Sequence, residues 1–129
     1  MKIYVITEGD YSDYHIVGVA TDLEMAKKIQ NYINREKWSY AEIEEYDTEE
    51  WKQLVNDNRP IYYVKETEDG GLYASQISYD YTDRYKSANM IMTDSDGRLK
   101  VYVLANDYKH ALKIASDLFA KYKAEKEGL

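Results

Sequence analysis

Hydrophobic and polar residues follow two different periods in the N-terminal third of the chain. Lys2 to Thr7 and His15 to Ala20 alternate, which predicts two strands joined by a turn over Glu8 to Asp13. A helical period follows in Leu23, Ala26, Ile29 and Ile33. A capping box that begins at Thr21 precedes this period, so we predict a helix from about Asp22 to Lys37.

The middle of the chain predicts a strand, a short helix and a hairpin. Trp38 to Tyr46 alternates, and the acidic run that starts at Asp47 opens a short helix carrying Trp51, Leu54 and Val55, which ends at Asn56 to Pro60. Two further strands are predicted over Ile61 to Thr67 and Leu72 to Asp80. The turn between them, Glu68 to Gly71, contains two glycines, which adopt positive φ at little cost.

The C-terminal third predicts a third hairpin and a second long helix. Ala88 to Thr93 and Leu99 to Ala105 flank the turn Asp94 to Arg98. Asn106 then caps a helix, and from Lys123 the chain is a charged end that we expect to fray. One apolar face of this helix is formed by Ala111, Ile114, Ala115, Leu118, Phe119 and Tyr122.

The two long helices lie in similar stretches of sequence. Gly18 to Ile29 aligns without gaps on Val103 to Ile114, and Ala, Asp, Ala, Lys and Ile coincide. Each stretch follows a predicted hairpin, so the chain contains a possible internal ββα repeat at its two ends; convergence of two capped helices is the alternative. We predict an α+β fold, a mainly antiparallel sheet with both long helices packed on one face.

Length and composition predict one domain, residues 1–129, in a reducing compartment. A chain of 129 residues can bury a core without disulfides, and it contains no Cys. No apolar run reaches the length of a membrane span, and the start moves directly into a strand pattern instead of a signal peptide. We therefore expect a cytoplasmic protein, in the host cell cytoplasm if it is encoded by a phage, with no membrane contact.

The aromatic composition favours binding. The chain has 15 Tyr and one Phe, and Tyr supplies rigid, amphipathic contact area at recognition surfaces. The alternative is that Tyr suits strands with one solvated face. A net charge of −7 argues against binding to a nucleic-acid polymer, which depends on Lys and Arg. It leaves open a small anionic ligand held by a local cluster, or an acidic surface that imitates nucleic acid.

No catalytic or metal-binding motif is present in the sequence. It lacks a P-loop, the Gly-x-Ser-x-Gly and Gly-x-Gly-x-x-Gly patterns, and a His-Glu-x-x-His pair. Asp94 to Gly97 begins like a calcium loop but lacks the later Glu, so a plain turn is favoured. His15 and His110 have no third ligand to complete a metal site. We predict a protein that is not an enzyme and has no cofactor.

Two segments combine rings with polar groups that recognise nucleotides. They are Gly9 to His15 and Tyr79 to Asn89, although a Tyr-rich turn between strands also explains the second. Rings stack on bases, Arg binds phosphate, and Asn reads base edges or ribose hydroxyls. The candidate ligand-binding residues are Tyr11, Tyr81 and Tyr85 for stacking, Arg84 and Arg98 for phosphates, and Asn89 for base or ribose.

The stretch Tyr4 to Val19, followed by a capped helix, resembles the N-terminus of a group of small phage and prophage proteins. Members include the phage Thoeris anti-defence sponges, which sequester cyclic ADP-ribose isomers. Those proteins also tend to close with a strand and a helix of the type predicted here at Asn106 to Ala120, so the resemblance covers about the outer half of the chain. It implies a homo-oligomeric sponge that traps a cyclic ADP-ribose isomer or a cyclic oligonucleotide without turnover. The alternatives are an acidic inhibitor of a host defence enzyme, acting by protein contact or nucleic-acid mimicry, and an enzyme that degrades the signal.

Overall fold

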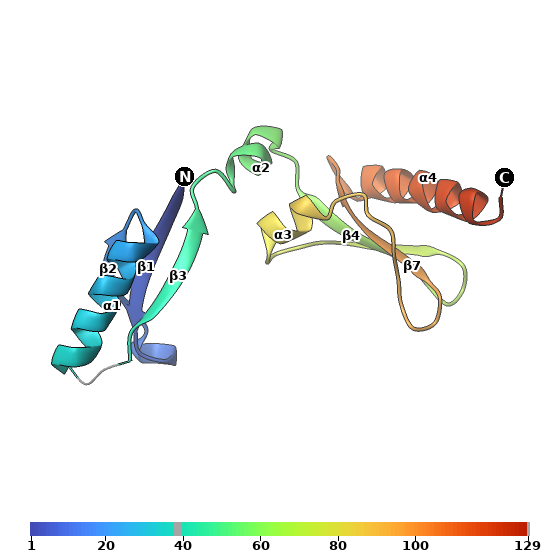
Figure 1. The fold of residues 1–129 in the computed structure, drawn as a ribbon. Coiled ribbons are helices and arrows are strands. Elements are labelled where there is room, and N and C mark those ends of the chain that lie inside the picture. Colours follow the sequence, from blue (N-terminus) through green and yellow to red (C-terminus); the bar gives the residue numbers. More distant parts are fainter. Residues whose placement is uncertain (38–39, 129) are drawn as a thin grey trace. The chain divides into compact units, whose positions relative to one another are not determined.

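The computed structural model describes residues 1–37 and 40–128 and divides the chain into two compact units. Unit 1 is Met1–Trp51 and unit 2 is Lys52–Leu129. Each unit contains an antiparallel sheet and one long helix (Figure 1). The predicted α+β class with antiparallel strands and two long helices is confirmed. The strands form two sheets instead of one, so each helix packs on a sheet of its own.

Unit 1 is a three-stranded sheet with a helix on one face. The strand order is β2-β1-β3, and both pairings are antiparallel. Its elements are β1 (Lys2–Glu8), the 3-10 turn η1 (Tyr11–Asp13), β2 (His15–Ala20), α1 (Leu23–Lys37) and β3 (Glu42–Asp47). Ile6 from β1 packs with Ala26 and Ile33 of α1, and this contact buries all three residues. The helix thereby removes one face of the sheet from water.

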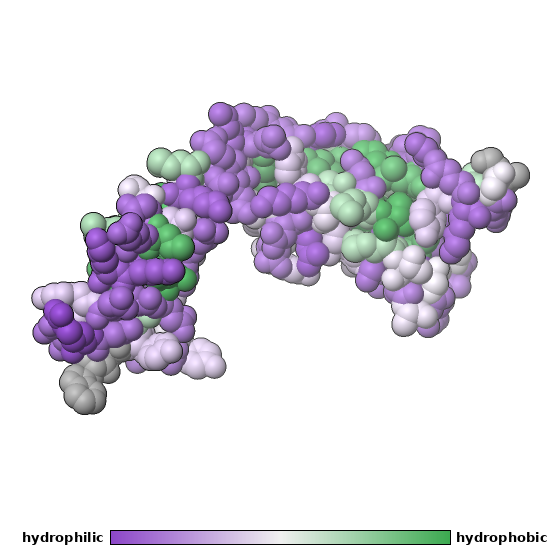
Figure 2. Space-filling view, viewed as in Figure 1, coloured by the Kyte–Doolittle hydropathy of each residue, from purple (hydrophilic) through white to green (hydrophobic). Residues whose placement is uncertain are grey.

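Unit 2 is a four-stranded sheet of order β5-β4-β7-β6, again antiparallel throughout. Its strands are β4 (Ile61–Glu66), β5 (Leu72–Gln76), β6 (Met92–Thr93) and β7 (Leu99–Leu104). Its helices are α2 (Lys52–Asp57), α3 (Tyr81–Lys86) and α4 (Tyr108–Lys126). Figure 1 shows α4 lying along the sheet, and Figure 2 shows apolar side chains gathered in this part of the molecule.

Both faces of the unit 2 sheet carry a hydrophobic cluster. Val64, Val101 and Val103 point to the face covered by α4, where they pack with Phe119. The alternate positions of the same strands point to the other face, where Leu104 packs with Leu54 of α2. This second cluster also has Tyr85 of α3 packed against it. The central strands β4 and β7 therefore carry buried residues on both faces of the sheet.

Both long helices begin at an Asp. The Asp22 Oδ1 accepts a hydrogen bond from the Met25 N–H at 2.7 Å, and the Asp107 Oδ1 accepts one from the His110 N–H at 2.8 Å. The predicted caps, Thr21 and Asn106, were each one residue too early. Since the two Asp residues occupy equivalent positions in the ββα alignment, the units share their helix-start geometry as well as their order of elements.

Three sequence expectations differ from the structure in the C-terminal half. Tyr81–Lys86 is the short helix α3 and not part of a loop, and the strand expected from Ala88 shrinks to β6, Met92–Thr93. The left-handed backbone of Asn89, with φ of 67°, turns the chain and prevents the longer strand. The charged end remains helical to Lys126, where Lys123 pairs with Glu66.

The short helix expected from Asp47 begins later, at Lys52, and excludes Trp51. The strand expected over Trp38 to Tyr46 is described only from Tyr40 on, since residues 38 and 39 lie outside the described residues; it is formed over Glu42–Asp47. Whether the chain behaves as the single domain that we predicted is a question of cooperativity, and that expectation stays a prediction.

Candidate functional site

A cleft in unit 2 combines basic and aromatic side chains. Its floor is the sheet face opposite α4, where the strand register places Ser75, Tyr63 and Tyr102 in one row. The neighbouring row contributes Met92 and Lys100. The segment Gln76 to Tyr79 and Arg84 complete the lining of a cavity of about 470 Å³. This volume lies within the usual range of small-molecule sites, about 300–1,000 Å³.

The Arg84 side chain is ordered by an aromatic ring. Its guanidinium carbon lies 4.6 Å from the centroid of the Tyr102 ring, a cation–π contact. The Tyr102 ring in turn lies 5.3 Å from that of Tyr63, tilted by 46°. The Arg84 Nε is buried and has no hydrogen-bond partner among the described residues. A buried donor without an acceptor is costly, so the Arg84 Nε is an unsatisfied polar group in the wall of the cleft.

The cleft is lined by two basic side chains, and one carboxylate, Asp94, lies close to its Tyr63. Arg84 and Lys100 are its two basic residues. Burial is the main cause that raises the pKa of Tyr63, and the nearby Asp94 and Tyr79 raise it further. Tyr63 therefore stays a neutral hydrogen-bond donor at physiological pH. Asp94 is already engaged, because its Oδ1 accepts hydrogen bonds from the backbone N–H groups of Asp96 and Arg98.

The structure does not bring the six predicted ligand-binding residues together. Arg84 alone among them lines the unit 2 cleft. Tyr85 and Asn89 line a different hollow beside α2, together with the ion-paired Asp57 and Arg59. The Asn89 N–H donates to the Tyr102 carbonyl at 2.7 Å, so the backbone of Asn89 supports the strand that carries the cleft.

The remaining three residues lie elsewhere. Tyr81 is the first residue of α3 and is not part of the cleft lining. Arg98 lies in the turn before β7, where its guanidinium is 3.3 Å from Asp96 and 3.6 Å from Glu68. Tyr11 belongs to unit 1 and is fully exposed. Its φ of 50° places it in the left-handed region, two residues after Gly9.

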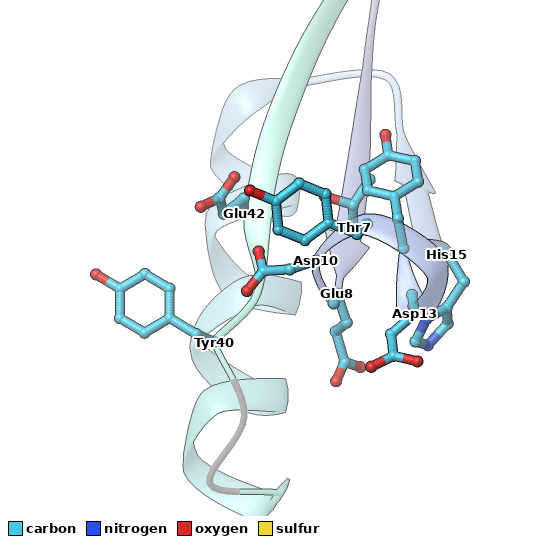
Figure 3. A pocket seen from close by; sticks show the side chains of 10 residues that line it. Thr7, Glu8, Asp10, Asp13, His15, Tyr40 and Glu42 are labelled. Carbon is cyan, nitrogen blue, oxygen red and sulfur yellow. Dashed lines mark hydrogen bonds between the residues drawn. The ribbon is translucent and has the colours of Figure 1, made fainter.

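Tyr11 lies in an acidic pocket of unit 1, with a volume of about 670 Å³. Figure 3 shows the Glu8 and Asp13 carboxylates near His15, with Tyr40 on the other side. Asp10 and Glu42 bring the acidic residues to four, and no Lys or Arg is among the described residues that line the pocket. A phosphate would be repelled here. Gly9, at the edge of this pocket, has no room for a side chain, because a Cβ at this position would lie 2.3 Å from the carbonyl oxygen of Asp13.

Sequence reasoning missed Tyr63, Lys100 and Tyr102. Lys100 and Tyr102 alternate with apolar residues along β7, which is the signal of a polar site on one face of a sheet, whereas Tyr63 follows Tyr62 in β4 and gives no such signal. Tyr79 lay within the second recognition segment but was not selected.

Among the described residues, no group of three or more His, Asp or Glu could hold a metal ion. None of the helices described here is both long and apolar enough to cross a bilayer.

Comparison of the chain with protein-family models, with curated proteins and with solved structures found no match in any of the three.

Proposed function

We propose that the protein is a non-enzymatic sponge that sequesters a small cyclic nucleotide in the unit 2 cleft. The ligand class is a cyclic ADP-ribose isomer or a cyclic oligonucleotide, as the resemblance of Tyr4 to Val19 to phage anti-defence sponges implies. The observation that carries the proposal is the buried, unpartnered Nε of Arg84, held over Tyr102 beside Lys100.

The chemistry of the cleft supports a phosphorylated guest with a flat ring. Arg84 and Lys100 supply positive charge for phosphate oxygens, and Arg is suited to such contacts because its planar fork donates several hydrogen bonds. Tyr63 and Tyr79 offer ring faces or hydroxyl groups to a base or ribose. The Arg84–Tyr102 contact orders the cation before the ligand arrives, which reduces the entropy lost on binding.

Sequestration then follows from mass action. The protein must be present in excess over the signal, and slow dissociation keeps the captured signal from its receptor. We retain homo-oligomerisation as part of the proposal, since it is implied by the same resemblance. No catalytic role is assigned to any residue of the cleft.

The test is to incubate the purified protein with an extract that contains cyclic nucleotide signals, wash it, heat it and analyse the supernatant by mass spectrometry. A sponge releases an intact cyclic nucleotide in an amount comparable to the protein. Release of a chemically altered compound, with the effect persisting at substoichiometric protein, would identify an enzyme instead. An empty supernatant would reject capture.

The second candidate is an inhibitor that acts by protein contact. The observation that favours it is the distribution of charge: residues 1–51 contain 12 acidic and 5 basic residues, whereas residues 52–129 contain 12 of each. The whole net charge of −7 therefore belongs to unit 1. An empty supernatant together with a host enzyme that co-purifies stoichiometrically and loses its activity would support this candidate.

A further inference from the structure

The sheet of unit 1 presents apolar side chains on the face opposite α1. Tyr4 and Ile6 point toward the helix, so the alternate residues of β1 point the other way. Residues paired across antiparallel strands share a face, and the register therefore defines the rest of the set. We call it the open face: Ile3, Val5 and Thr7 of β1, Ile16 and Val19 of β2, and Glu42, Glu44 and Tyr46 of β3.

The outer strand β2 leaves two β-branched residues of the open face largely exposed, whereas Val5 and Thr7 on the central strand β1 are buried. Ile16 is 60% exposed and Val19 is 58% exposed, and they lie on the same strand. In unit 2 the corresponding sheet face is covered in part by the cluster that includes Leu54 and Leu104, and the rest of it is the floor of the cleft. Contiguous apolar exposure with a polar rim is typical of a surface that contacts another molecule.

Two tyrosines on this side are held in position by one carboxylate. The Tyr14 hydroxyl donates to the Glu44 Oε1, and the Tyr46 hydroxyl donates to the Glu44 Oε2, both at 2.5 Å. Each ring remains about half exposed. Ordered, half-exposed Tyr rings next to aliphatic side chains are the residues that contribute most at protein interfaces, because little entropy is lost when they are covered.

The charge on the open face has one sign. Glu42 and Glu44 belong to it, and it contains no Lys or Arg. Lys2 points to the opposite face, where it lies 3.6 Å from Glu45, and the other four basic residues of unit 1 are in α1. The acidic pocket adjoins this face, since Thr7 and Glu42 line the pocket as well. Negative charge thus flanks the apolar residues on the β3 side and at the pocket end of the face.

We propose that the open face is a docking surface for a protein partner that presents apolar side chains flanked by Lys and Arg. The apolar residues of the partner cover Ile16 and Val19, and its cations meet Glu42 and the acidic pocket. A second copy of this chain is a poor occupant, because a two-fold contact between two open faces would bring together two surfaces that both carry negative charge. The proposal is independent of nucleotide capture, since the cleft belongs to unit 2.

The test uses the full-length protein and a fluorescently labelled synthetic peptide in which Lys alternates with Val. We expect binding in a fluorescence anisotropy titration that weakens as salt is added, because the interaction is partly electrostatic. Val19→Lys should reduce the affinity by roughly tenfold or more, as a substitution at the centre of an interface does. The matched control is Val55→Lys, since Val55 lies in α2 of unit 2 and is 62% exposed.

Two comparisons separate docking from attraction between opposite charges. A second peptide, with Val replaced by Ser and the charge unchanged, should bind at least about tenfold more weakly if the apolar residues take part. Equal binding of both peptides, or equal losses of affinity for Val19→Lys and Val55→Lys, would overturn the proposal. So would a dimer in sedimentation experiments that Val19→Lys converts into a monomer, because that result assigns the face to a second copy.

Discussion

Units 1 and 2 combine the same parts, an antiparallel sheet and a long helix that begins at an Asp, yet they use the second face of the sheet differently. In unit 2 that face carries the Leu54 and Leu104 cluster and the cleft with Arg84. In unit 1 it carries exposed Ile16 and Val19 beside acidic residues. One scaffold thus supports a neutral unit with a basic cleft and an acidic unit with an apolar surface.

The largest expected effect distinguishes the two cores. Phe119→Ala removes a buried ring from unit 2 and should lower its free energy of unfolding by about 3–5 kcal/mol, while Ile6→Ala should cost unit 1 about 2–5 kcal/mol. Since Phe119 and Ile6 belong to separate hydrophobic clusters, we expect hydrogen-exchange protection to fall in the substituted unit alone. Loss of protection in both units after either change would support the predicted single domain.

The next effect tests the cleft. Arg84→Ala should weaken capture of a cyclic nucleotide by about 10- to 100-fold in calorimetric titration, because charge-assisted hydrogen bonds contribute about 1.5–3 kcal/mol. Without ligand, the variant should lose less than about 1 kcal/mol of stability, since the stacking of Arg84 on Tyr102 is the main interaction that it removes. Arg35→Ala is the matched control, because Arg35 also stacks on a tyrosine, Tyr32 at 5.3 Å, in unit 1.

Capture that survives Arg84→Ala unchanged would remove this residue from the site. The same titration with Arg98→Ala decides whether that second predicted phosphate ligand takes part. Arg98 forms ion pairs with Asp96 and Glu68 and is not part of the cleft lining. We therefore expect its substitution to change the affinity for the nucleotide by less than about threefold.

A smaller effect compares the two helix starts. Asp22→Ala and Asp107→Ala should each lower the free energy of unfolding by about 1 kcal/mol, since each removes the acceptor of a capping hydrogen bond. Thr21→Ala and Asn106→Ala, one residue earlier, should change it by less than about 0.5 kcal/mol. Thermal or urea unfolding measures all four. A larger loss of stability for Thr21 or Asn106 would restore the sequence-based assignment of the caps.

The smallest effect concerns the pH dependence of unit 1. The hydrogen bond to Glu44 raises the pKa of Tyr14 to about 12. Because this pKa is higher than in the unfolded chain, the stabilisation is complete below about pH 10 and is lost as the pH rises through about 12. Hydrogen bonds from Tyr14 and then Tyr46 lower the pKa of Glu44, so that contribution is present above pH 4.5 and is lost on further acidification.

Tyrosine-labelled NMR titration checks this pair. Glu44→Gln should return the pKa of Tyr14 toward the ordinary value of about 10, whereas the pKa of Tyr63 in unit 2, which is raised mainly by burial, should not move. An unchanged Tyr14 titration in Glu44→Gln would contradict the assigned cause.

The sequence determined the local elements, because periodicity and turn residues act over a few neighbouring positions. The helix from Leu23, the existence of the first two hairpins and the α+β class follow from such patterns, although the strand predicted over Leu72 to Asp80 ends at Gln76. The prediction failed at Tyr81–Lys86, since a short helix with few apolar residues has no periodic signal. It also failed at Ala88, where Asn89 has a positive φ and its N–H donates to the carbonyl of the distant Tyr102.

Only the tertiary structure decided which side chains meet. Arg84 was identifiable from its aromatic neighbours in the sequence, but its contacts with Tyr102 and the row shared with Tyr63 depend on strand register. The same holds for the open face, where Val19 and Glu44 flank Val5 through pairings across three strands. Sequence spacing determines on which face of an element a side chain lies. Pairing between distant strands determines which side chains lie next to it, and a binding surface depends on those contacts.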